Sequence, residues 1–389
     1  MSADIVHAHI RSELDRHLDA KVDESSRERL ALLVSGIIEA ESACPARIAA
    51  ALHKLGLSQA TTASLERQIR RIENDPELQA ALCVHPFARQ HLLWGRPKTL
   101  MLILDPTSQD ERVVMLTVAV WYRGRALPLA WAVWPANTPL AGARFWERVG
   151  ALLSVVAGLL PAGVTITWLA DRAFGSPVFT DQIAAHGWHW VVRVQGQTRY
   201  RDPLGRVQTV RDLVSGPGAR AKRRGDVFKK HGWRTASVVA LWGRHEKSPL
   251  LLVSDLRPDW ALLAYYRKRY PIEATFRDYK SSGWQWERGQ VVDLAHVEHL
   301  LVGMALASWL VICAGTRQAE AELQRPPTGR RRTVAYPGKR SLFTLGLQNF
   351  VHWVTRLGSA CWQLTGWDSP NWSTQLYQHA ARAYVFTLA

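Results

Sequence analysis

Three apolar segments between residues 99 and 134 constrain the fold of this chain most strongly. The polar pairs Asp110-Glu111 and Arg123-Gly124 separate them, and such breaks are typical of turns between strands. The pattern therefore predicts a three-stranded antiparallel meander. The residues that follow predict, in alternation, a helix at 144–160, a strand at 164–170, a helix at 177–186 and a strand at 188–194.

This order of elements, three antiparallel strands and then helix, strand, helix and strand, is that of an RNase H-like core. In that fold the first and fourth strands lie side by side. The first strand is a continuous apolar run that ends at Asp105, and the fourth ends at Asp171. A single acid at a strand end is most often a cap or turn residue. Two acids on neighbouring strands would lie close together at the rim of the sheet.

A third acid lies among basic and aromatic residues. Tyr266, Arg269, Glu273 and Lys280 follow one another at steps of three, four and seven residues. These steps keep side chains on one face of a helix. On a plain DNA-binding helix the carboxylate of Glu273 would repel phosphate, but it has a use if it binds a metal ion while its neighbours bind the DNA backbone. A solvated helix with ordinary ion pairs is the alternative, and the two upstream acids argue against it.

Pro271 interrupts this segment, because proline removes a helical hydrogen bond and restricts the residue before it. The sequence allows either a kinked helix or a new helix with Pro271 in its first turn. In both cases Glu273, Arg277 and Lys280 share one face.

These residues resemble those of bacterial cut-and-paste DDE transposases of the insertion-sequence-four family. The signature of that family, Tyr-x2-Arg-x3-Glu-x6-Lys, is matched without a gap from Tyr266 to Lys280. Asp105 and Asp171 match the first and second acids of the family by their strand context. The run Asp-Arg-Ala-Phe-Gly-Ser from Asp171 also resembles the family, although Ala173 stands where glycine is more common. The resemblance covers roughly residues 95–315.

The acids predict the chemistry of a metal-dependent nuclease. Phosphodiester cleavage needs an activated water and a stabilised leaving oxygen, and two divalent cations supply both. Mg²⁺ prefers carboxylate oxygens and keeps several waters, so two or three acids suffice. We expect two Mg²⁺ ions, which Mn²⁺ can replace, with Asp105 bridging both and Asp171 and Glu273 each binding one. The DNA contacts expected from the signature segment are Tyr266, Arg269, Arg277 and Lys280.

The resemblance implies cut-and-paste DNA transposition, in which cleavage at the transposon ends frees a 3′-hydroxyl that then joins to target DNA. The implied partner is double-stranded DNA, both the terminal inverted repeats of the insertion sequence and the target, bound by a homodimer in the synaptic complex. Two alternatives remain open. An RNase H-like repair or junction nuclease has no need for the signature with a basic insertion, and a non-catalytic transposase-derived DNA-binding regulator tends to lose the acids.

Residues at about 195–256 predict a β-rich insertion, which is also a feature of the resembled family. The insertion carries the densest charge of the chain, and we expect these side chains to face phosphates: Arg220, Lys222, Arg223, Arg224, Lys229, Lys230 and Arg234. A flexible solvated loop is the alternative. The resemblance also implies an insertion aromatic that stacks on a flipped base, for which Trp233 is the first candidate and Trp242 the second. Both could equally belong to the core of the insertion.

Composition agrees with a polyanionic partner, since the formal net charge is +16 and the sequence pI is about 10.1. Membrane surfaces attract the same charge, but the most apolar stretch, at 300–314, is shorter than a bilayer span and predicts a buried helix. No signal peptide is evident in the first twenty residues, and the four cysteines are scattered. We expect no membrane partner and a cytoplasmic, nucleoid-associated protein.

The predicted fold class is α/β: an RNase H-like mixed sheet flanked by helices, interrupted by the insertion, with helical N-terminal and C-terminal parts. Residues 1–94 predict a helical domain that binds the DNA end. Within it Pro45, Gly56 and the basic residues Arg67, Arg70 and Arg71 resemble a helix-turn-helix, with an ordinary helical hairpin as the alternative. Residues 95–320 are the predicted catalytic domain, and 321–389 a basic linker followed by C-terminal helices. The resemblance implies that such C-terminal helices can pair two copies of the protein.

Overall fold

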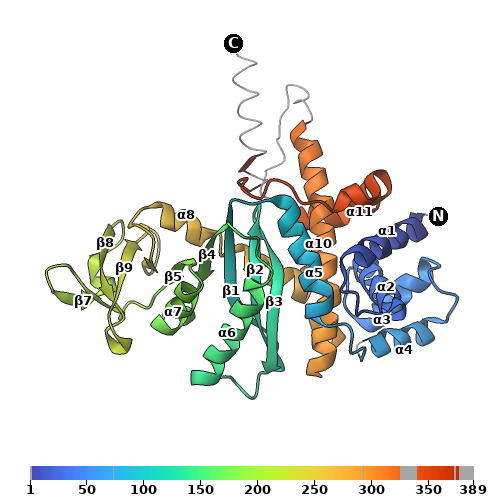
Figure 1. The fold of residues 1–389 in the computed structure, drawn as a ribbon, viewed down its shortest axis with the longest axis horizontal. Helices are drawn as coiled ribbons and strands as arrows, with labels where there is room; N and C mark the ends of the chain where they lie inside the picture. Colours follow the sequence, from blue (N-terminus) through green and yellow to red (C-terminus); the bar gives the residue numbers. More distant parts are fainter. Residues whose placement is uncertain (1, 73, 292, 325–339, 372–373, 376–389) are drawn as a thin grey trace, which may run out of the picture.

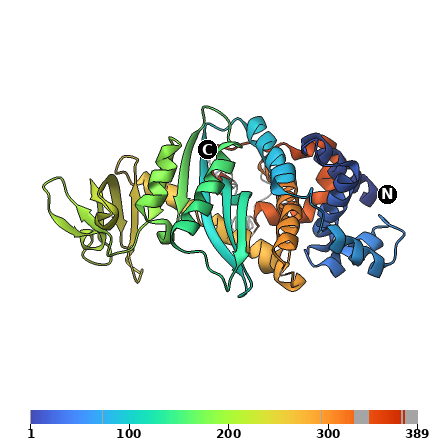
Figure 2. The same ribbon diagram turned by 60° about the horizontal axis from the view of Figure 1, so that its bottom comes forward.

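The computed structural model describes residues 2–72, 74–291, 293–324, 340–371 and 374–375 (Figure 1). Figures 1 and 2 show three parts in a row along the longest axis of the molecule. The N-terminal helices lie at one end, the central sheet in the middle and the strands of residues 199–241 at the other end. The predicted basic linker at 325–332 lies outside the described residues.

The predicted meander is confirmed. It consists of β1 (Thr99–Gln109), β2 (Val113–Tyr122) and β3 (Arg125–Pro135), paired antiparallel in chain order. Strand β4 (Thr165–Ala170) pairs parallel with β1, and β5 (His189–Arg193) pairs parallel with β4. The first and fourth strands therefore lie side by side, as an RNase H-like core requires.

The predicted β-rich insertion extends the central sheet. Its strands are β6 (Arg199–Arg201), β7 (Val207–Thr209), β8 (Arg220–Val227), β9 (Arg234–Leu241) and β10 (Leu250–Ser254). Strand β10 pairs antiparallel with both β5 and β9, so it joins the insertion to the core. Within the described residues this gives one ten-stranded sheet, in the order β3-β2-β1-β4-β5-β10-β9-β8-β6-β7.

The side chains of β2 and β3 are almost all buried. Four helices pack against β3: α5 (Ala80–Gly95), α6 (Gly142–Ala157), α9 (Pro271–Arg277) and α10 (Leu294–Gln324). Two further helices of this region are α7 (Pro177–Ala185) and α8 (Ala261–Arg267). Short turns complete this part: 3-10 turns at Arg172–Phe174, Val210–Leu213, Lys229–His231 and Trp286–Gly289, and a π-helical turn at Asp278–Ser282.

Helix α10 alone, among the described residues, is long and apolar enough to cross a membrane. Its most apolar stretch is 89% buried inside the protein, which is typical of the core helix of a globular protein. The buried helix expected at 300–314 is therefore present, and it is longer than predicted. Helix α11 (Leu342–Leu357) packs against it, followed by a 3-10 turn at Gly358–Trp362.

The N-terminal part is helical as predicted: α1 (Ser2–His17), α2 (Glu24–Ala40), α3 (Pro45–Lys54) and α4 (Thr62–Ile72), leading to α5. Pro45 occupies the first turn of α3, and Gly56 in the following loop has a φ of +70°, which glycine adopts without strain. Helix α4 buries Leu65, Ile69 and Ile72, and its arginines are exposed. Two helices joined by a loop are present in this segment, as both a helix-turn-helix and an ordinary helical hairpin require. Its helix-turn-helix identity and its contact with DNA stay predictions.

Candidate active site

The register of β1 and β4 brings the first two acids together. The parallel ladder ends at the pair Leu104–Ala170, and Asp105 and Asp171 are the next residue on each strand. Asp171 accepts a hydrogen bond from the backbone N–H of Arg172 and caps the turn that follows. One detail of the prediction is wrong: β1 does not end at Asp105 but runs on to Gln109, because β2 continues to pair with it.

The third acid lies on a new helix. Helix α8 ends at Arg267 and α9 begins with Pro271 at its first position, so Pro271 starts a helix and does not kink one. Glu273 lies in the first turn of α9 and is exposed, as is Arg277. The side chains of Ile272, Thr275 and Phe276 are buried on the opposite side.

Arg269 joins the first and third acids. Its Nη1 donates to Oδ2 of Asp105 at 2.9 Å, and its Nη2 donates to Oε1 of Glu273 at 2.5 Å. The guanidinium side chain is only 8% exposed. Burial opposes its charge, but the carboxylates of Asp105 and Glu273 outweigh this effect and raise the pKa of Arg269. Arg269 is therefore an internal counter-ion that holds the two acids at one place.

Asp105 is under opposing influences. Burial raises its pKa, the nearby positive charge of Arg269 lowers it, and the negative charges of Asp171 and Glu273 raise it again. The result is a pKa of about 6. A cation bound beside Asp105 would lower this pKa, because positive charge stabilises the ionised form of the carboxyl.

This pKa predicts how stability depends on pH in metal-free protein. The folded pKa of about 6 lies above the unfolded value of about 4, so the folded state holds the proton more tightly between these values. The free energy of unfolding should therefore fall as pH rises from about 4 to about 6, by up to about 3 kcal/mol from this group. Urea unfolding of wild type and Asp105→Asn over this range measures it. Parallel curves for the two proteins would contradict the prediction.

The acids are suitable ligands for divalent cations, but in this structure they do not surround a common metal position. Among the described residues, no group of three or more His, Cys, Asp or Glu lies in a position to hold a metal ion. The guanidinium of Arg269 lies between Asp105 and Glu273, where a cation bound by both would have to lie. The three carboxylates lie on rigid elements, and the guanidinium of Arg269 offsets part of their negative charge. Once Arg269 turns away, their oxygens fit the ligand preference of Mg²⁺.

The other signature residues differ in their exposure. Tyr266 is 1% exposed, its hydroxyl has no hydrogen-bond partner in the described structure, and burial raises its pKa to about 12. Lys280 lies in the π-helical turn, half-buried, with Nζ 3.9 Å from Oε1 of Glu287. The pattern did not indicate Tyr270, which is 45% exposed with the Arg269 guanidinium 5.2 Å from its ring centre. The only sequence feature that could have pointed to Tyr270 is that it is an aromatic residue directly before Pro271.

The basic residues of the insertion lie on its surface. Strand β8 carries Lys222, Arg223 and Arg224, and the turn after it carries Lys229 and Lys230; all five are exposed. The ammonium of Lys222 lies 5.8 Å from the ring centre of Trp260, the residue before α8. Arg224 Nη1 donates to Oγ of Ser237 at 3.0 Å. These contacts place part of the basic strand beside the segment that leads into the signature.

The two candidate tryptophans are both partly buried and both covered by a guanidinium. Arg201 lies 4.7 Å from the ring centre of Trp233, and Arg211 lies 4.0 Å from that of Trp242. The indole N–H of Trp242 also donates to the backbone carbonyl of Glu246 at 2.8 Å. Neither ring is free on both faces, so the geometry favours neither base stacking nor a core role.

Comparison with known families addresses the central part of the chain. Residues 149–310 match the family model of the transposase DDE domain. This match supports a DDE transposase, with the nuclease chemistry that such a domain implies. It spans less than half of the 389 residues. The matched DDE domain includes Asp171, Glu273 and Lys280, whereas Asp105 lies before it.

The other comparisons add little. No curated protein sequence matches the chain significantly. Among the solved structures that match is human ENDOV, with 13% identity over 50% of this chain and 95% of that chain, and a TM-score of 0.26. A likeness at this level carries no argument about the function of the DDE domain.

Proposed function

We propose that the protein is a transposase that cuts DNA at the ends of an insertion sequence and joins the freed 3′-hydroxyl to target DNA. The observation that carries this proposal is that Arg269 bridges Asp105 and Glu273 while Asp171 follows the strand next to that of Asp105, within a chain whose central part matches a DDE domain. The signature from Tyr266 to Lys280 supports the insertion-sequence-four family in particular.

In this proposal Asp105, Asp171 and Glu273 would hold two Mg²⁺ ions, with Asp105 shared by both. When bound, these ions (or Mn²⁺ in their place) activate the attacking water and stabilise the leaving oxygen. The acids are carried by rigid supports, two neighbouring strands and one helix packed on the sheet, which would limit how far the acids move during the reaction.

The bases of the signature hold the DNA end. In this proposal Arg269, once it leaves the acids, and Lys280 bind the terminal phosphates. Arg277 is exposed on α9 four residues after Glu273 and supports this assignment. The hydroxyl of Tyr266 is buried and has no hydrogen-bond partner among the described residues. In this proposal it donates a hydrogen bond to a phosphate oxygen of the DNA. The protein acts as a homodimer on double-stranded DNA, in the cytoplasm and associated with the nucleoid.

The test is cleavage of labelled DNA that carries the inverted repeats flanking the gene. The proposal predicts Mg²⁺-dependent nicking at the repeat ends, followed by joining of the new 3′ ends to a target plasmid. Cleavage of branched or damaged DNA without regard to the repeats would indicate a repair or junction nuclease. Specific binding without cleavage would indicate a DNA-binding regulator.

The exposed bases of β8 should bind phosphates. A Lys222→Ala/Arg223→Ala variant is expected to bind repeat DNA more weakly, and the slope of log affinity against log salt should fall by about 0.9 for each phosphate that the variant no longer binds. Fluorescence anisotropy at several salt concentrations measures this slope. Arg148→Ala is the control for loss of an exposed positive charge, because Arg148 lies on α6 and is not among the expected DNA contacts. Equal slopes for the double variant and wild type would exclude β8 from the interface.

Trp233 remains the first candidate for stacking on a flipped base, and Trp242 the second. What supports Trp233 is its place beside the exposed Lys229 and Lys230. Because a guanidinium covers each ring, stacking would require Arg201 or Arg211 to move aside.

A further inference from the structure

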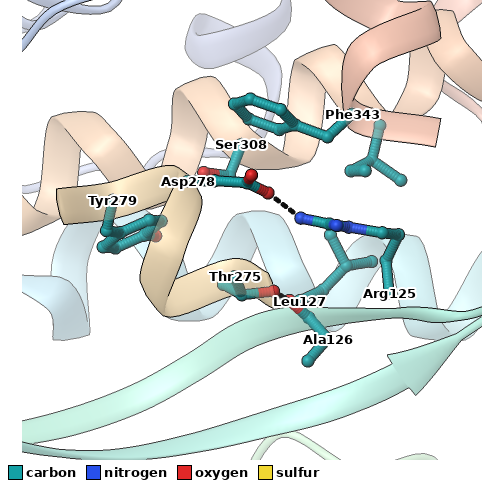
Figure 3. A pocket seen from close by; sticks show the side chains of 9 residues that line it. Arg125, Ala126, Leu127, Thr275, Asp278, Tyr279, Ser308 and Phe343 are labelled. Atoms are coloured by element: carbon teal, nitrogen blue, oxygen red, sulfur yellow. Dashed lines mark hydrogen bonds and ion pairs between the residues drawn. The ribbon is translucent and has the colours of Figure 1, made fainter. Parts of the chain in front are cut away.

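A small cavity lies beneath α9 and the π-helical turn that follows it, between β3, α10 and α11 (Figure 3). Its volume is about 10 Å³, room for about one water molecule, so it is not a ligand site. What distinguishes it is its polar lining. Figure 3 shows Arg125 and Asp278 facing each other inside it, with Phe343 above them.

Arg125 and Asp278 form a buried ion pair. The guanidinium of Arg125 contacts Oδ2 of Asp278, and the two side chains are only 8% and 14% exposed. The ring of Phe343 from α11 covers the guanidinium at 5.7 Å. Desolvation makes such a pair costly, and an apolar pair of similar size is often as stable or more so. Stability alone therefore gives no reason for a charged pair here.

The location of the pair offers another reason. Asp278 is the first residue of the π-helical turn that directly continues α9, the helix of Glu273. Nearly one turn earlier, Oγ1 of Thr275 donates to the backbone carbonyl of Ala126 at 2.8 Å. Arg125 and Ala126 begin β3, which pairs with β2, which pairs with β1 and its Asp105. Two directed polar contacts thus tie the helix of the third acid to the sheet of the first.

We propose that Arg125 and Asp278 are positioning residues, which fix the rotation of α9 on β3 and so keep Glu273 facing Asp105 across the Arg269 guanidinium, the orientation that the metal site needs once Arg269 leaves. This inference rests on the proposed function. The apolar side chains of α9, Ile272 and Phe276, bury surface without fixing a direction. The ion pair and the Thr275 hydrogen bond fix it, because both depend on orientation.

The test separates positioning from simple stability. In the full chain, the double variant Arg125→Met/Asp278→Leu replaces the pair by apolar groups, which buried sites often accept without loss of stability. We expect its urea unfolding midpoint to stay near that of wild type, while its affinity for Mn²⁺, measured by electron paramagnetic resonance without DNA, falls about tenfold. Ser308→Ala, which alters another polar group of the same cavity, should leave Mn²⁺ affinity unchanged.

Wild-type Mn²⁺ affinity in a folded double variant would overturn the inference. If that variant does not fold, Thr275→Val removes the second contact at constant size, and we expect a several-fold loss of affinity; an unchanged affinity would again overturn the inference. Glu273→Gln is measured in parallel. If it binds Mn²⁺ as wild type does, the proposed metal site itself fails, and the role of the pair falls with it. A weaker Mn²⁺ affinity in Glu273→Gln, together with an unchanged affinity in the double variant, would refute only the positioning role and leave the proposed metal site standing.

Discussion

Asp105→Asn, Asp171→Asn and Glu273→Gln should each reduce strand cleavage by at least about 10³-fold, since bound cations contribute several kcal/mol to the transition state and each 1.4 kcal/mol is tenfold. The amides keep the shape of the side chains but lose the charge that binds Mg²⁺. Binding of the repeat DNA should stay close to wild type, because none of the three acids is expected to contact phosphate directly. Single-turnover cleavage and anisotropy on the same labelled ends measure both effects.

Glu147→Gln is the control for removal of one negative charge, because Glu147 is an exposed acid on α6 with no part in the site. Its cleavage rate should equal that of wild type. Near-normal cleavage by one of the three variants would remove that acid from the catalytic set. Loss of DNA binding together with cleavage would show that the acid shapes the protein surface and does not serve only the chemistry.

The meeting of the first two acids could be predicted from sequence because it follows from chain order. Apolar runs of strand length show the strands, and the fold they predict has one parallel neighbour for β1. Asp105 and Asp171 then lie close together, because each directly follows one residue of the last pair of the ladder, Leu104 and Ala170. The new helix at Pro271 was one of the two outcomes that the sequence left open, and the structure decides between them. Both predictions depend on backbone patterning that is local in sequence.

What could not be predicted depends on contacts between distant side chains. Arg269 and Asp105 are 164 positions apart, and nothing in either segment indicates that one guanidinium bridges two of the acids. The pair of Arg125 and Asp278 is equally invisible, because each residue alone resembles a surface charge. The extension of β1 beyond Asp105 was missed because Thr107 and Ser108 are polar, and only the pairing with β2 makes them strand residues.

The counter-ion role of Arg269 leads to the second large effect. Arg269→Ala leaves the buried carboxylate of Asp105 without its cation, and removing one partner of a buried pair costs about 3–5 kcal/mol. We expect the metal-free variant to lose about that much unfolding free energy at pH 8 and less at pH 5. At the lower pH the carboxyl, whose pKa is about 6 even with Arg269 present, takes up a proton and needs no counter-ion. Urea unfolding at the two pH values measures the difference.

The same variant should bind metal more tightly and DNA less well. Without the guanidinium no positive charge competes at Asp105 and Glu273, so Mn²⁺ affinity should rise at least about tenfold, and added Mn²⁺ should restore the stability of the variant. The salt slope of DNA binding should fall by about 0.9 in Arg269→Ala, the value for one phosphate, as in Lys280→Ala. Arg269→Lys is the matched control, because it keeps the charge but cannot bridge both acids. If Arg269→Ala binds Mn²⁺ no better than wild type, Arg269 does not compete with metal, and its two ion pairs only stabilise the fold.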